Sequence, residues 1–230
     1  MIEVPVPFIF ALLIGVLLTK VMRKGLADGL RARVLWFGIA CGVLAVIVGL
    51  RWQSDLLIFR VLQPIAASIL PPMAWLCFSA LGKQKPSILS LAGHLAFLVI
   101  IWFCVATWQL WRPPVDALLA VQFIVYGAFL LACANGDETR LSQANIGNMR
   151  LARQLVGAVG GLLVMSGVVD GLITLDFLLQ EGVHAPSIVS YANLVLIGIL
   201  VWLVGRIGDV VPAEHPTDTP KSAIDADTKV

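Results

Sequence analysis

The chain has 230 residues, of which 59% are hydrophobic and 13% are charged, and its formal net charge at pH 7 is +2. Soluble domains carry about 25% charged residues, so the composition excludes an ordinary soluble domain and indicates an integral membrane protein. The net charge is uninformative as a total, and the positions of the charges along the chain matter more.

Apolar runs that are long enough to cross a bilayer recur along the chain. A spanning helix needs about 20 mainly apolar residues, and seven runs qualify: residues 4–22, 34–50, 56–81, 88–108, 115–134, 155–179 and 187–207. We therefore predict an all-α integral membrane bundle of seven transmembrane helices within residues 1–208, surrounded by the lipid bilayer. Residues 209–230 are polar and proline-containing, which predicts a disordered cytoplasmic tail.

The basic residues predict the orientation of this bundle, because Lys and Arg accumulate in cytoplasmic loops. One side receives thirteen of them: Lys20, Arg23, Lys24, Arg31, Arg33, Lys83, Lys85, Arg140, Arg150, Arg153, Arg206, Lys221 and Lys229. The other side receives Arg51, Arg60 and Arg112. The asymmetry predicts an outer N-terminus and a cytoplasmic C-terminus. The long inner loop Asn135–Gln154 has apolar residues at helical spacing, which predicts an amphipathic helix on the membrane surface.

The third run is unusual because it contains Pro64, Pro71 and Pro72. A proline has no backbone N–H, so these three free the carbonyls of the residues four positions earlier, which are Arg60, Ala67 and Ser68. In a membrane, neighbouring groups must satisfy such carbonyls. The run is therefore predicted to lie inside the bundle, with the three prolines as a hinge that changes bend during signalling.

Polar residues at membrane depth are the candidate ligand-binding site, since intramembrane polar groups face the bundle interior or a wet cavity. With the predicted orientation, seven of them lie in the outer half: Arg60, Gln63, Gln122, Asp170, Asp176, Tyr191 and Asn193. Arg60 is predicted to pair with Asp170 or Asp176. Three roles are open for such a pair. It could simply join two helices, it could form the floor of an outer pocket, or it could belong to a proton or ion pathway.

No pattern of catalytic or metal-binding residues accompanies these polar groups. The four cysteines, Cys41, Cys77, Cys104 and Cys133, form no CxxC pair, and His94, His184 and His215 are scattered. We therefore predict no metal, no cofactor and no enzymatic activity, and we interpret His94 as a core histidine with a satisfied hydrogen bond.

Small residues four apart mark helix faces that can approach closely. The pairs are Gly38 and Gly42, Gly157 and Gly161, and Gly167 and Gly171. They predict packing within the bundle. A homodimer seam on the run 155–179 is the alternative.

The segment Phe59–Trp75, with its Leu-Gln-Pro and Pro-Pro-Met-Ala-Trp motifs, resembles the membrane-embedded sensor region of bacterial AraC-type transcription regulators, as do Gly136–Glu138, Arg150–Arg153 and Val168–Phe177. The resemblance covers about residues 57–177. In that family a multi-helix membrane region precedes a cytoplasmic helix-turn-helix domain. The resemblance implies a place in the bacterial inner membrane and a role in transcription regulation, with Arg60, Gln63, Pro64, Pro71, Pro72, Asp170 and Asp176 as the matching positions.

The chain departs from that family after Gly208. Residues 210–230 contain two lysines and the four carboxylates Glu214, Asp218, Asp225 and Asp227, which is no surface for binding phosphates. We expect no direct nucleic-acid binding. The favoured function is a multi-pass sensor that passes an outer or membrane signal to a cytoplasmic regulator protein. The alternatives are a small transporter or permease subunit, although inverted repeats are absent from the sequence, and a structural membrane scaffold.

Overall fold

The protein is all-helical in the residues that its structure, a computed structural model, describes. These are residues 5–23, 28–54, 56–79, 88–111, 113–135 and 149–208, and within them there are eight α-helices and no strand. The helices are α1 (Val6–Arg23), α2 (Asp28–Gln53), α3 (Leu57–Ser79), α4 (Ile88–Ala106), α5 (Trp108–Trp111), α6 (Val115–Asn135), α7 (Met149–Gln180) and α8 (Ala185–Gly208). The predicted tail 209–230 lies outside the described residues.

Six of the helices are long and apolar enough to cross a membrane: α1, α2, α3, α6, α7 and α8. The described apolar stretch of α4, Leu91–Ala106, is shorter. The fold is therefore consistent with the predicted helical membrane bundle, whereas a seventh span and the orientation remain predictions.

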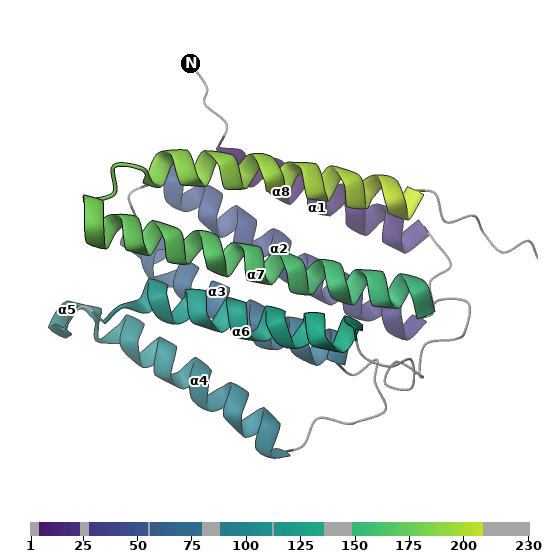
Figure 1. Cartoon of the computed structure of the whole chain (residues 1–230), viewed down its shortest axis with the longest axis horizontal. Coiled ribbons are helices and arrows are strands. Elements are labelled where there is room, and N and C mark those ends of the chain that lie inside the picture. Colours follow the sequence, from purple (N-terminus) through teal and green to yellow (C-terminus); the bar gives the residue numbers. More distant parts are fainter. Residues whose placement is uncertain are drawn as a thin grey trace, which may run out of the picture.

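The same six helices form a closed ring. In the order α1, α2, α3, α6, α7, α8, each helix contacts the next, and α8 contacts α1 again. Helix α4 packs on the outside of the ring against α3 and α6, and Figure 1 shows it as the outermost helix, inclined to its neighbours. The proline-containing helix α3 therefore contacts helices on three sides, as its composition requires.

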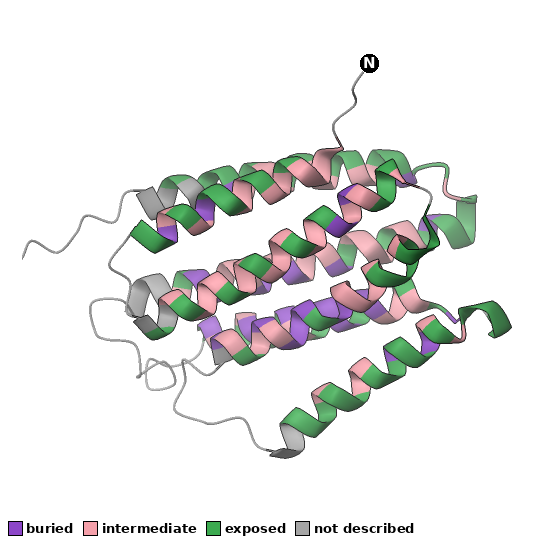
Figure 2. Ribbon diagram, turned by 180° about the vertical axis from the view of Figure 1, so that it is seen from behind, coloured by how far each residue is buried: buried purple, intermediate pink, exposed green. Residues whose placement is uncertain are grey.

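The apolar core lies between α3, α6 and α7. Its buried members are Leu70, Ala74, Phe78, Phe123, Leu130, Ala134, Leu155, Val156 and Leu163. Figure 2 shows buried residues gathered towards the middle of the bundle, while exposed residues run along the outer helices. Those outer faces expose large apolar side chains such as Val99, Phe103 and Leu194. Soluble proteins rarely expose such surfaces, and a surrounding bilayer accounts for them.

Glycines allow α6 and α7 to approach closely. A Cβ atom built on Gly127 would lie 2.7 Å from the carbonyl oxygen of Gly160, and one on Gly167 would lie 2.7 Å from the carbonyl oxygen of Ala120. The predicted internal packing of the small residues is thus confirmed at Gly167. At Gly161 and Gly171, by contrast, an added Cβ meets nothing within 4 Å, so the predicted homodimer seam stays a prediction.

Two helices extend beyond the predicted apolar runs. Helix α2 begins at Asp28 rather than Val34, and α7 begins at Met149 rather than Leu155. The basic residues in these two stretches end the apolar runs but do not end the helices. Arg and Lys are good helix formers, and their long side chains carry the charge away from the helix. In α7, Arg153 donates from Nε to the carbonyl of Ala134 at the end of α6. Residues 149–154 thus belong to α7 and Asn135 belongs to α6, whereas residues 136–148 of the predicted loop lie outside the described residues.

Candidate functional site

Ser68 joins three helices through hydrogen bonds in the interior of the bundle. Its carbonyl oxygen accepts from Nε2 of Gln122 on α6 at 2.9 Å, and its hydroxyl oxygen accepts from Nε1 of Trp102 on α4 at 3.1 Å. The Ser68 hydroxyl in turn donates to the carbonyl of Ile65 at 2.7 Å. Ser68 and Gln122 are both buried, with Gln122 only 1% exposed. This polar junction holds α3 to α4 and α6.

The polar junction is a consequence of the prolines. Helix α3 continues through Pro64, Pro71 and Pro72, and the carbonyl of Ser68 lies four residues before Pro72, which has no N–H to donate. The amide of Gln122 supplies the missing donor from the neighbouring helix. The sequence predicted that Pro72 frees this carbonyl and that Gln122 faces the interior. It did not predict that the two groups meet.

A second polar contact lies between α4 and α6. Nδ1 of His94 contacts the hydroxyl of Tyr126, and the two ring centroids are 5.3 Å apart. The predicted hydrogen bond of His94 is confirmed, but the residue is half-buried on the peripheral helix α4 rather than in the core. Helix α4 is thus attached to the ring by polar contacts from both Trp102 and His94, although much of its surface is exposed.

Asp176 closes the turn between α7 and α8. One carboxylate oxygen accepts from the backbone N–H of His184 at 2.9 Å, and the other lies 3.2 Å from Nδ1 of the same residue. The carboxylate thereby satisfies an N–H at the start of α8, where a negative charge is favoured by the helix dipole. Glu181 and Gly182 reverse the chain with φ values of 57° and 82°. This turn, together with the two contacts of the Asp176 carboxylate to His184, is termed the outer hairpin below, after the side of the membrane that the sequence predicts for it.

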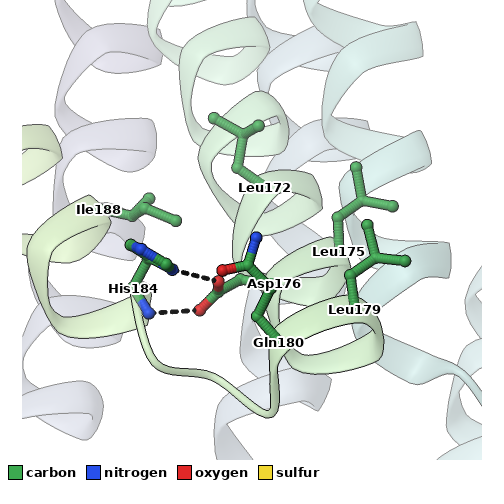
Figure 3. A pocket seen from close by; sticks show the side chains of 7 residues that line it. All are labelled: Leu172, Leu175, Asp176, Leu179, Gln180, His184 and Ile188. Atoms are coloured by element: carbon green, nitrogen blue, oxygen red, sulfur yellow. Dashed lines mark hydrogen bonds and ion pairs between the residues drawn. The ribbon is translucent and has the colours of Figure 1, made fainter.

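A pocket of about 260 Å³ lies beside the outer hairpin. Its lining is Leu172, Leu175, Asp176, Leu179, Gln180, His184 and Ile188. Figure 3 shows the carboxylate of Asp176 facing the ring and backbone nitrogen of His184, with the leucines along α7. The side chain of Asp176 is 6% exposed and that of His184 is 59% exposed. A buried carboxylate therefore orients an accessible imidazole at the edge of an apolar surface.

The other predicted site residues lie apart from these two groups. Arg60 is exposed in the first turn of α3, and Gln63 accepts a hydrogen bond from Arg51 of α2 at 2.5 Å. On α8, Tyr191 is exposed and Asn193 is half-buried. Asp170 is half-buried in α7.

The outer hairpin differs from the pair predicted from the sequence. The partner of Asp176 is His184, eight residues further along the chain, rather than Arg60 of α3. The sequence search missed His184 because it sought partners on other helices. The available signal was local: a glycine turn between two apolar helices brings residues on either side of it together.

The described residues hold no group of three or more His, Cys, Asp or Glu side chains that could bind a metal ion. In the dyad of Asp176 and His184, the carboxylate orients the imidazole, which is itself a base. This arrangement supports a hydrogen bond between the imidazole and a bound ligand. No family model, no curated protein and no solved structure matches the chain.

We expect Asp176→Ala to loosen the outer hairpin. The substitution removes the acceptor for the backbone N–H of His184, and hydrogen bonds to charged groups contribute about 1.5–3 kcal/mol. Amide hydrogen exchange of the peptide that contains residues 182–186 should become about tenfold faster or more. Asp176→Asn keeps one acceptor oxygen and should give a smaller increase. Unchanged exchange in both variants would contradict the role of the Asp176 carboxylate in holding the turn.

Proposed function

We propose that the chain is a multi-pass membrane sensor of the bacterial inner membrane, with seven spanning helices, an outer N-terminus and a cytoplasmic C-terminus. The outer hairpin receives the signal, α3 changes its bend or position, and the inner end of the bundle passes the change to a cytoplasmic regulator protein. The resemblance to the sensor region of AraC-type regulators supports a regulator that controls transcription.

The outer hairpin is the observation that carries this proposal. A buried carboxylate is costly unless it is paired, and Asp176 is paired with a histidine that remains accessible in a pocket. Intramembrane ionisable groups of this kind are by default candidates for function.

The distribution of charge supports the proposed orientation. Lys20 and Arg23 end α1 and Arg31 lies near the start of α2, at one end of the bundle. The outer hairpin lies at the opposite end, as the course of α7 and α8 in Figure 1 shows. Cations mark the cytoplasmic side of membrane proteins, so the outer hairpin is assigned to the outer side.

Helix α3 is the proposed link between the two ends. It spans the bundle, and its Ser68 carbonyl depends on a side chain from α6. Helix α6 makes the most extensive contact of the bundle with α7, which carries the outer hairpin. A shift of α7 is thereby transmitted through α6 to the segment of α3 where prolines leave the backbone fewest hydrogen bonds of its own.

The test compares wild type and Asp176→Asn by native mass spectrometry of tagged protein, extracted gently from its host membrane. We expect the wild type to carry a cytoplasmic protein with a DNA-binding or signalling domain, and the variant to carry at least severalfold less of it. Gln53→Asn, an exposed polar change at the end of α2, is the control. A chain that carries no such protein and moves solute in proteoliposomes is a transporter and contradicts the proposal.

A further inference from the structure

The pocket at the outer hairpin is apolar along its length and polar at one end. Leu172, Leu175, Asp176 and Leu179 follow the i, i+3, i+4, i+7 spacing of a single helix face. From Leu172 to Gln180 this face extends about 12 Å, at 1.5 Å per residue. It ends at the carboxylate, amide and imidazole of the outer hairpin.

The leucines of this face are accessible to a ligand. Leu172, Leu175 and Leu179 are 48%, 52% and 78% exposed although they line the pocket. In Figure 3 Leu172 lies above the Asp176 carboxylate, Leu175 and Leu179 lie on one side of it, and the His184 ring lies on the other. An apolar chain that lies along these leucines would contact hydrocarbon along its length, and its end would reach the polar groups.

The imidazole of His184 determines which head group fits. A carboxylate only accepts hydrogen bonds, so the ring nitrogen that faces Asp176, Nδ1, carries a proton. In the neutral ring Nε2 then presents a lone pair, and in the charged ring it presents an N–H. A hydroxyl group both donates and accepts, and therefore complements Nε2 in either state. A carboxylate head group complements only the charged ring and would lie beside Asp176.

We propose that this pocket binds a hydroxyl-bearing membrane amphiphile, with its hydroxyl at Nε2 of His184 and its apolar chain along Leu172, Leu175 and Leu179. The guest enters from the bilayer, because the leucines lie on a face of α7 that the bundle does not cover. This inference names the ligand class for the sensor proposed above and rests on that role for its meaning in signalling.

Imidazole nitrogen NMR tests the inference directly. Full-length protein with ¹⁵N-labelled histidine is placed in phospholipid nanodiscs and titrated with decanol, and with decane as the matched probe that lacks the hydroxyl. His184→Gln assigns the resonances, since the chain has only three histidines. We expect a saturable shift of the His184 Nε2 signal with decanol and none with decane. An equal shift with decane, no saturable shift, or a parallel shift of His94 would overturn the inference.

Two leucine variants keep the test specific. Leu175→Ala removes apolar contact from the pocket and should raise the decanol concentration at half-saturation about threefold or more. Leu178→Ala changes an equally apolar residue of α7 that is 75% exposed and does not line the pocket, and it should leave the titration unchanged. Equal effects of the two variants would also overturn the site.

The titration and the partner experiment fail independently. Saturable decanol binding with no regulator captured from the host leaves the amphiphile site in place and removes the sensory role. Capture of a regulator that depends on Asp176, together with no decanol response, leaves the sensory role and overturns this ligand class.

Discussion

Gly167→Ala is expected to destabilise the bundle by about 3 kcal/mol, at the upper end of the range for overpacked cores. The added methyl group would lie 2.7 Å from the carbonyl oxygen of Ala120 and 3.0 Å from the backbone nitrogen of Ile124. Backbone atoms cannot rotate away as a side-chain end can, so α6 and α7 must separate. The contact between these two helices is the most extensive in the bundle, and its loss affects the whole core.

The same helix supplies the matched control for this prediction. Gly171 lies one turn further along α7, and a Cβ there meets nothing within 4 Å. Gly171→Ala should therefore be neutral or stabilising by up to about 1 kcal/mol, because alanine favours a helix over glycine. Unfolding of both variants in mixtures of dodecylmaltoside and SDS measures the difference. Equal stability of the two variants would show that the helices do not approach closely at Gly167.

The apolar runs predicted the helices well because their signal is local. Membrane spans depend on length and apolarity alone, and six of the predicted runs coincide with long apolar helices. The boundaries near Asp28 and Met149 were less predictable, since basic residues such as Arg153 continue a helix while they bind neighbouring carbonyls. The break between α4 and α5 at Thr107 also escaped prediction, because Trp108 continues the mainly apolar run 88–108 beyond it.

The pairing of polar groups was the harder part, because it depends on how helices rotate about their axes. The sequence predicted that Gln122 and Asp176 are important polar groups at depth. Their partners, Ser68 and His184, follow from packing. At Ser68 a physical rule came close, since Pro72 identifies the carbonyl that needs a donor. At Asp176 the glycine turn between it and His184, eight residues further along the chain, was a local signal that favoured His184 over Arg60, but the prediction considered only partners on other helices.

Gln122→Met is expected to destabilise the protein by about 1–3 kcal/mol, the usual cost of leaving a buried polar group without its partner. Methionine is similar in length to glutamine but cannot donate to the Ser68 carbonyl. Oε1 of Gln122 is itself buried and has no partner among the described residues, so its removal offsets part of the loss. Gln53→Met, at an exposed position at the end of α2, should change the stability by less than about 0.5 kcal/mol.

A double-mutant cycle with Pro72→Ala tests why Gln122 matters. Alanine at position 72 restores a backbone N–H that can donate to the Ser68 carbonyl within α3, so Gln122→Met should cost less than half as much in this background as in wild type. Pro64→Ala is the control background, because Pro64 frees the carbonyl of Arg60 rather than that of Ser68, and there the full cost should persist. If Gln122→Met costs the same in all three backgrounds, the glutamine does not replace the missing proline N–H, and the polar junction is no weak point through which α6 acts on α3.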